Sequence, residues 1–576
     1  MKKLTLENKD ELSPYIKQAD YNEYNSNIIT MLMWSSMYEV YFETFEHYAI
    51  AYTKMPNHPT IWMMPYCTKE YRKKAMQTIQ VYSSTLGMEF EIHSMTLEFK
   101  NWLQENYPDE FLVWDCYNAR DYIYERKQQE TLVGKKMQKR RNHYNAFLKE
   151  YEGRFVYKAL EECDIPNIYE LLKAWKANKD HDDSIDAEEA GIRLLLTNLN
   201  TLEIQGGCIY IDGQLQAFNI TSRLSKDTVQ IHVEKANRSV RGLYIAILKL
   251  FLETLDEEVL YLNREDDMGH PELRKAKTDM QPISKTQKFG SCHQKIEISK
   301  ANNTFLESIK ALWTARFEDE TKESTKYFFT HMYHEEECYI LYSEEELIAM
   351  MQTRKMKILL DGKEEQVSFI VGVATNDEYE GCGYMKRLMN YVLEDLKKSE
   401  RFTLLQAYDW DVYKAFGFEE VYALSKTKLD KASFTDKTGT LSPCTSPNLL
   451  LENYQIFTKD KNGYRVRDTK YYEQKIAYSA LWNYVILLHE INGVMDGYSI
   501  LEEQEDALYI HECIYQSETA RDQMLSLLCE HDKKVFVMLE EDVELPGRKK
   551  AITHMMVKEL GSETFPKKPL FINEEL

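Results

Sequence analysis

The stretch that decides the fold is FIVGVAT at residues 369–375, which runs on into EGCGYM at residues 380–385. The first run is an apolar strand that ends in small residues. A helix is predicted next, because apolar residues recur at helical spacing from Met385 to Leu396. Glycines at 381 and 383 let backbone N–H groups approach a ligand with no Cβ in the way, and the helix dipole favours an anion there. The stretch therefore predicts a pyrophosphate site, with a plain turn as the alternative.

The residues that follow strengthen the first interpretation. A second strand, FTLLQAY at residues 402–408, leads into VYKAFGF at residues 412–418. The order strand, Gly-x-Gly, helix, strand and Tyr-x-x-Phe-Gly-Phe resembles the GNAT acetyltransferases over about residues 305–430. The resemblance implies acetyl-CoA (coenzyme A) as the cofactor and a small-molecule or peptide amine as the acceptor. It implies cofactor-binding roles for Val371, Val373, Gly381, Gly383, Tyr384 and Met385.

Tyr413 is the candidate catalytic residue. The resemblance implies that its phenol protonates the departing thiolate, and a phenol with a pKa near ~10 can serve as a general acid. A core aromatic is the alternative. Two positions depart from the family pattern: Glu380 stands where a carboxylate repels a pyrophosphate, and Met385 replaces a small residue. A large apolar residue there resembles the enhanced-intracellular-survival type, which has two GNAT units in tandem.

The same order of elements recurs along the chain. A hairpin, a helix and a strand are predicted at 205–222, 242–256 and 258–263, and similar sets at 346–408 and 484–540. We therefore predict an α/β (α+β) fold of several GNAT-like acyltransferase units in tandem, with mixed central sheets flanked by helices. Boundaries are predicted near 294–304 and in the Ser/Thr/Pro-rich tract 431–449. Residues 298–430 form the GNAT domain, and residues 450–576, without a Gly-x-Gly loop, form a second, non-catalytic unit.

Two motifs stand out before residue 298. LVGKKMQKRRNHYNAF at 132–147 is densely basic, and NREDDMGHPELRKAK at 263–277 follows a predicted strand. Together they resemble the C-terminal domain of phosphatidylglycerol lysyltransferases, a tandem of GNAT-like halves related to Fem-type aminoacyltransferases. The resemblance covers most of residues 1–297, with a boundary between halves near 115. The candidate substrate- or anion-binding residues are Lys135, Lys136, Arg140, Arg141, Asn142, Glu265, Asp266, Asp267, Arg274 and Lys277.

Each of these motifs has an alternative interpretation. The basic run 135–141 is either a solvated helix face or an anion site for phosphate or tRNA. The acidic run 265–267 favours ion pairs with the Arg and Lys that follow it over a metal ion. His331, His334 and Cys338 have helical spacing but lack a fourth ligand, so no metal site is predicted.

Composition restricts the remaining choices. The chain has 576 residues and a formal net charge of −22, which disfavours a general nucleic-acid binder and favours a cationic amine acceptor. At ~150 residues per domain, about four units are expected. The sequence has no apolar run of the ~20 residues that span a membrane. Its start is charged where a signal peptide would be apolar, and its ten cysteines are scattered along the chain. We therefore expect a cytoplasmic protein.

The sequence thus predicts a cytoplasmic acyltransferase that moves an acetyl group from acetyl-CoA to an amine. Two alternatives stay open. In the first alternative, the N-terminal half is an aminoacyl-tRNA-dependent aminoacyltransferase. In the second, the whole chain is a non-catalytic scaffold of degenerate GNAT units. The identity of the acceptor, the general base and the oligomeric state do not follow from the sequence.

Overall fold

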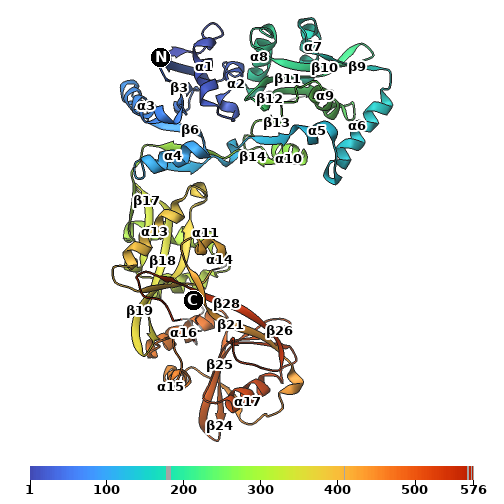
Figure 1. Cartoon of the computed structure of the whole chain (residues 1–576). Coiled ribbons are helices and arrows are strands. Elements are labelled where there is room, and N and C mark those ends of the chain that lie inside the picture. Colours follow the sequence, from blue (N-terminus) through green and yellow to red (C-terminus); the bar gives the residue numbers. More distant parts are fainter. Residues whose placement is uncertain (177–182, 408, 567–569, 573, 575–576) are drawn as a thin grey trace. The chain divides into compact units, whose positions relative to one another are not determined.

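The computed structural model describes residues 1–576 except 177–182, 408, 567–569, 573 and 575–576. The chain divides into two compact units, Met1–Lys295 and Ile296–Leu576. Each unit consists of mixed sheets flanked by helices, which confirms the predicted fold class (Figure 1).

The first sheet of the N-terminal unit has eight strands among the residues described, and β5 (Tyr66–Cys67) joins it beside β3. The other strands, in spatial order, are β1 (Lys2–Lys3), β2 (Glu39–Thr44), β3 (Tyr48–Lys54), β4 (Ile61–Met63), β6 (Glu91–Thr96), β15 (Lys288–Cys292) and β7 (Leu112–Asp115). Its part of the chain contains the helices α1 (Lys9–Ala19), α2 (Ile28–Met33), α3 (Arg72–Leu86) and α4 (Leu97–Asn106).

The second sheet of this unit has seven strands in the described part of the chain. Their order is β14 (Ser284–Lys285), β8 (Tyr122–Glu125), β13 (Tyr261–Asn263), β12 (Thr228–Ala236), β11 (Gln214–Arg223), β10 (Gln205–Ile211) and β9 (Phe155–Ala159). The helices are α5 (Arg126–Thr131), α6 (Gln138–Glu150), α7 (Ile165–Lys176), α8 (Asp183–Thr197), α9 (Leu243–Leu252) and α10 (Pro271–Asp279). Strands β12 and β13 are parallel, and the largely buried helix α9 makes the crossover between them.

The chain passes between these two sheets twice. Residues 116–121 lead from β7 to β8, and residues 286–287 lead from β14 back to β15 in the first sheet. The two connections are hydrogen-bonded to each other, because Asp121 N donates to Thr286 Oγ1 at 2.8 Å and Thr286 N donates to Asp121 O at 2.9 Å. This junction carries much of the polar chemistry of the N-terminal unit.

The C-terminal unit contains one continuous sheet, with thirteen strands among the residues described. The first part is β16 (Ile296–Lys300), β17 (Cys338–Ser343), β18 (Glu346–Leu360), β19 (Lys363–Thr375) and β20 (Phe402–Leu405). The second part is β28 (Gly547–Glu559), β21 (Glu419–Leu429), β27 (Lys534–Glu540), β26 (Ala507–Tyr515), β25 (Val494–Glu503), β24 (Val485–Ile491) and β22 (Thr440–Pro443), and β23 (Tyr464–Arg465) pairs with β18. The helices are α11 (Leu306–Arg316), α12 (Lys322–His331), α13 (Tyr384–Leu396), α14 (Trp410–Lys414), α15 (Pro447–Thr458), α16 (Thr469–Leu481) and α17 (Glu518–Leu528).

The centre of this sheet is built by strands that are far apart in sequence. The last strand, β28, lies between β20 and β21, while β21 also pairs with β27. The segment 431–449 contains the edge strand β22 and is therefore part of one sheet rather than a linker between two separate sheets. Of the strand predicted at 402–408, β20 occupies Phe402–Leu405, and residue 408 lies outside the described part of the chain.

Candidate functional sites

The predicted cofactor strand, β19, changes its pairing at Val371. Gly372 pairs with Gln352 of β18, but Ile370 pairs with Thr353, so Val371 is an extra residue in a β-bulge. On its other side β19 pairs with β20 only at residues 368–370. Residues 371–375 of β19, which include Val371 and Val373, therefore extend beyond the β20 pairing and open this side of the sheet.

The glycine loop lies between the end of β19 and the start of α13. Gly381 (φ 70) and Gly383 (φ 91) both have left-handed backbone, and Gly383 is the N-cap of α13. A Cβ built on Gly381 would meet nothing within 4 Å, so the loop is open at this point. The first turn of α13 has no acidic residue, and Lys386 within it is exposed. The positive end of a helix dipole suits an anion, so the chemistry of this loop fits a pyrophosphate.

The carboxylate of Glu380 has a cationic partner, Arg316. Arg316, the last residue of α11, forms ion pairs with Glu380 at 2.6 Å and with Asp377 at 2.5 Å. The same guanidinium donates two hydrogen bonds to the backbone oxygen of Thr375, at 2.7 and 2.9 Å. Arg316 therefore offsets the carboxylate that the sequence had placed against a pyrophosphate. Sequence reasoning missed this residue, because it precedes the loop by more than sixty positions.

The other predicted residues of this site occupy different environments. Tyr384 is fully buried and packs edge-on against Tyr379, so its side chain belongs to the core, whereas Met385 is half-buried. Tyr413 is half-buried on the short helix α14, and its ring meets Phe418 edge-on at 6.2 Å. Burial raises the pKa of Tyr413. A phenol with a raised pKa keeps its proton at neutral pH, which suits a general acid.

In the N-terminal unit, the acidic run follows β13 directly, and its three carboxylates have separate partners. Gln230 Nε2 donates to Glu265 at 2.8 Å, Tyr24 OH donates to Asp266 at 2.9 Å, and Tyr122 OH donates to Asp267 at 2.6 Å. Arg274 of α10 forms an ion pair with Asp267 at 3.0 Å, as the sequence led us to expect. Glu265 has a left-handed backbone (φ 59), which is rare for such a residue and is typical of functional sites.

The environments of the three acids differ in their effect on protonation. Burial raises the pKa of Glu265 to about 7, and burial also raises the pKa of Asp266. The hydrogen bonds from Arg274 hold the pKa of Asp267 well below its usual range. Burial lowers the pKa of Lys277, whose ammonium donates to the backbone oxygens of Arg264 and Asp266. A carboxyl with a pKa near neutrality, as at Glu265, can both donate and accept a proton at physiological pH.

His232 is a buried imidazole beside this acidic run. Its Nε2 shares a hydrogen bond with Ser222 Oγ at 2.7 Å, and its Nδ1 lies 3.8 Å from Glu265. That buried Nδ1 has no hydrogen-bond partner among the residues described. Burial lowers the pKa of His232 to about 3, so the ring stays neutral at physiological pH and can act as a hydrogen-bond partner of a bound group.

A second group of buried charged residues, centred on Lys288, adjoins the acidic run and was not predicted from the sequence. Lys288 of β15 forms ion pairs with Asp121 at 2.5 Å and with Glu23 at 3.5 Å, and all three side chains are buried. The Lys288 ammonium also lies 4.1 Å from the ring centre of Tyr24. These residues come from distant parts of the chain and have no shared motif, so only the fold brings them together.

The residues of the basic run point in different directions. Lys135 and Lys136 are exposed in the short 3-10 helix η4 (Lys135–Met137) that precedes α6, and Asn142 accepts a hydrogen bond from Gln138 at 2.7 Å. Arg141 donates to the backbone oxygens of Leu132 and Gly134, so it stabilises the local turn. Burial and the neighbouring Arg264 lower the pKa of Arg140. Only part of this run therefore faces solvent, where a polyanion would bind.

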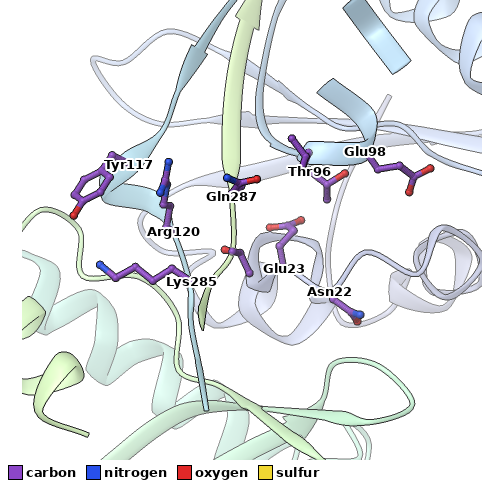
Figure 2. Close-up of a pocket in the computed structure, with 10 residues that line it drawn as sticks. Asn22, Glu23, Thr96, Glu98, Tyr117, Arg120, Lys285 and Gln287 are labelled. Atoms are coloured by element: carbon purple, nitrogen blue, oxygen red, sulfur yellow. The ribbon is translucent and has the colours of Figure 1, made fainter. Parts of the chain in front are cut away.

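A cavity of about 740 Å³ lies at the junction of the two sheets of the N-terminal unit (Figure 2). Asn22, Glu23, Thr96 and Glu98 appear on one side of this view, and Tyr117, Arg120 and Lys285 on the other. Thr96 is the N-cap of α4, Glu98 lies in its first turn, and Asn22 and Glu23 follow α1. On the other side, Tyr117 and Arg120 come from the connection 116–121, and Lys285 ends β14. The cavity therefore has separate acidic and basic walls.

Comparison with known proteins agrees with both resemblances. Residues 18–292 match the family model of the phosphatidylglycerol lysyltransferase C-terminal domain, and residues 297–421 match that of the GNAT acetyltransferase domain. The chain thus joins two domains of acyltransferase type. Its N-terminal half resembles the C-terminal domain of phosphatidylglycerol lysyltransferases, and its C-terminal half resembles tandem GNAT acetyltransferases.

The individual proteins that the chain resembles have low sequence identity to it. An uncharacterized protein of Mycoplasmoides gallisepticum is 25% identical over 181 residues, which is 31% of this chain and 58% of the relative's length. A conserved protein of unknown function from Bacteroides thetaiotaomicron is 25% identical, with a TM-score of 0.47 over 50% of this chain and 98% of that one. A GCN5-related N-acetyltransferase from Anabaena variabilis is 16% identical, with a TM-score of 0.40 over 46% of this chain and 73% of that one. Among the described residues, no helix is long and apolar enough to cross a membrane.

Proposed function

We propose that the C-terminal unit transfers an acetyl group from acetyl-CoA to an amine acceptor. The observation that carries this proposal is the open side of the sheet at Val371–Thr375, which leads into the glycine loop at the N-terminus of α13. Gly381, Gly383 and the first N–H groups of α13 would hold the pyrophosphate, and Val371 and Val373 would flank the pantetheine arm. When bound, acetyl-CoA supplies an activated thioester.

Tyr413 is proposed to donate a proton to the leaving sulfur. Its raised pKa keeps the phenol protonated, and its hydroxyl has no hydrogen-bond partner among the described residues. Arg316 is proposed to keep Glu380 away from the pyrophosphate by holding that carboxylate in an ion pair. The net charge of −22 favours a cationic amine as the acceptor.

Calorimetry with acetyl-CoA tests the cofactor part of this proposal. A Gly383→Glu variant should bind at least about tenfold more weakly, because it adds a side chain and a negative charge where the pyrophosphate lies. Gly493→Glu is the matched control, since Gly493 also has a positive φ (82) with open space around its Cβ. No binding to the wild type, or equal binding to both variants, would contradict the proposal.

Turnover of acetyl-CoA separates the enzyme from a scaffold of degenerate units. If Tyr413 is the general acid, Tyr413→Phe should lower turnover roughly a hundredfold while acetyl-CoA binding stays unchanged. Undiminished turnover in this variant would remove Tyr413 from the mechanism. A wild type that binds acetyl-CoA but never turns it over with any amine would support the scaffold instead.

The N-terminal unit supports a second candidate function, transfer of an aminoacyl group from aminoacyl-tRNA. The observation in its favour is the buried centre at Glu265, where an acid with a pKa of about 7 lies beside the uncharged His232. The exposed Lys135 and Lys136 would contact tRNA phosphates. Replacing both by Gln should reduce the slope of log binding constant against log salt concentration by up to about 1 per lost phosphate contact. The same replacement at the exposed pair Lys73 and Lys74 is the control and should leave the slope unchanged. Absence of salt-dependent tRNA binding to the wild type would exclude this function.

A further inference from the structure

Tyr117 is surrounded by positive charge at the basic wall of the cavity in the N-terminal unit. The ring centre of Tyr117 lies 5.1 Å from Arg120, 5.4 Å from Arg274 and 5.4 Å from Lys285. The ring itself is 50% exposed, although large aromatic side chains are usually covered. An exposed aromatic face among three cations is an unusual feature of a chain that carries a net charge of −22.

The three cations around Tyr117 have only two carboxylates, Asp115 and Asp267, as ion-pair partners. Asp115 accepts from Arg120 at 2.7 Å, and the buried Asp267 forms an ion pair with Arg274 at 3.0 Å. Lys285 lies 3.9 Å from Asp267, which is already engaged with Arg274. The buried Nε of Arg120 has no hydrogen-bond partner in the described part of the chain. The basic wall therefore has about one positive charge in excess, and an anion at this wall would balance it.

On the opposite wall Glu98 is already paired with Lys69 and Arg72, and the excess of negative charge lies around Glu23. Glu23 lines the cavity and is only 3% exposed, and the ammonium that faces it, Lys288, lies closer to Asp121 (2.5 Å) than to Glu23 (3.5 Å). Asp266, also buried, belongs to the same network through Tyr24. Two carboxylates thus share one ammonium, and a second cation would be stabilised beside Glu23.

We propose that this cavity binds an amphoteric small molecule, with an anionic group between Arg120 and Lys285 and a primary ammonium against Glu23. A volume of about 740 Å³ suits a small molecule rather than a macromolecular segment. The exposed ring of Tyr117 and the side chain of Leu97 offer apolar surface for the carbon chain between the two charges. The ligand is an amino acid with separated charges or a phosphorylated amine. This inference is independent of the function proposed for the C-terminal unit.

Calorimetry on the full chain tests the proposal with γ-aminobutyrate and O-phosphoethanolamine as the two zwitterionic probes. Butyrate, inorganic phosphate and butylamine are the corresponding half-ligands. One of the zwitterions should bind at least tenfold more tightly than either of its halves, because each wall of the cavity then has its counter-charge. The better zwitterion identifies the anion as carboxylate or phosphate. Half-ligands that bind as tightly as the zwitterions, or no binding of any probe, would overturn the proposal.

Two substitutions assign the ends of the ligand. Lys285→Met should weaken the zwitterion at least tenfold and leave butylamine binding unchanged, and Glu23→Gln should weaken the zwitterion and butylamine together. Lys275→Met, which removes an exposed charge from the neighbouring helix α10, is the matched control and should have no effect. Glu23 belongs to a buried network, so the folding of its variant is checked by thermal unfolding. If that variant does not fold, equal zwitterion binding by wild type and Lys285→Met still overturns the proposal.

Discussion

Glu574 is the clearest case of a single residue that holds distant segments together. Its carboxylate accepts from Arg465 at 2.8 Å, from Arg467 at 3.1 Å and from Tyr471 at 3.0 Å, and the residue is 1% exposed. Its neighbours in the chain, Phe571 and Ile572, are buried in two different core clusters. Phe571 and Ile572 therefore pack against both parts of the large sheet.

Replacing Glu574 by Ala should destabilise the C-terminal unit by about 3–5 kcal/mol, because two buried guanidiniums lose a partner. Burial alone would raise the pKa of Glu574, but Arg467 and Arg465 outweigh it and lower that pKa to about 2. The stabilisation is thus complete above the usual glutamate pKa and is lost as the pH falls from about 4.5 toward 2. Urea unfolding measured from pH 7 to pH 3 checks both points. A variant with the wild-type pH dependence would contradict the assignment.

The pKa of Glu265 predicts the opposite pH dependence in the N-terminal unit. Its pKa rises on folding from the usual 4.5 to about 7, so the native state holds its proton more tightly. This contribution to the free energy of unfolding is complete below pH 4.5 and is lost as the pH rises through 7, by at most about 3 kcal/mol. Glu265→Gln should flatten the stability profile between pH 5 and pH 8, whereas the exposed Glu258→Gln should not. Parallel profiles for the two variants would show that Glu265 is already ionised.

The ion pairs that could be predicted from the sequence join residues that are close together in the chain. Asp267 and Arg274 are seven positions apart, and their ion pair follows from β13 leading into α10. Lys288 pairs with Glu23 and Asp121 from other segments, and Arg316 reaches Glu380 from another helix. Charged residues are common on every segment, so the sequence does not reveal which distant pair will meet.

At the scale of elements, periodicity was a reliable guide. The helix predicted after the glycine loop is α13, and its buried face includes Leu388, Met389, Val392 and Leu396. The bulge at Val371 had no such signal, since it arises from the register between β18 and β19. The sequence therefore predicted the elements around the glycine loop but not the opening between β19 and β20.

The packing of α11 on β19 depends on the absence of a side chain at Gly372. A Cβ there would lie 2.9 Å from the Trp313 ring and 3.1 Å from the Phe317 ring. Gly372→Val should therefore displace α11, destabilise the unit by about 1–3 kcal/mol and weaken acetyl-CoA binding, because Arg316 ends the same helix. Urea unfolding and calorimetry measure the two effects. Gly561→Val, at a position with open space, is the control, and equal stability of both variants would contradict this packing.

At the scale of the whole molecule, strand order decides which parts fold alone. The sequence predicted a GNAT domain at 298–430, but β28 from residues 547–559 lies between β20 and β21. A strand pairing across more than one hundred residues has no local signature, because either edge of a predicted sheet can accept a strand. The domain limits 298–430 therefore stay a prediction, and the sheet itself continues beyond them through β28.

This strand order predicts the behaviour of three fragments. Residues 296–430 lack β28, so β20 and β21 lose the strand that joins them, and this fragment should show no cooperative unfolding transition and should aggregate through its open edges. Residues 296–576 should unfold in one transition because they share a continuous sheet. Residues 1–295 form their own compact unit and should fold alone. Circular dichroism and gel filtration distinguish these outcomes, and a folded, monomeric 296–430 fragment would show that the pairing with β28 is dispensable.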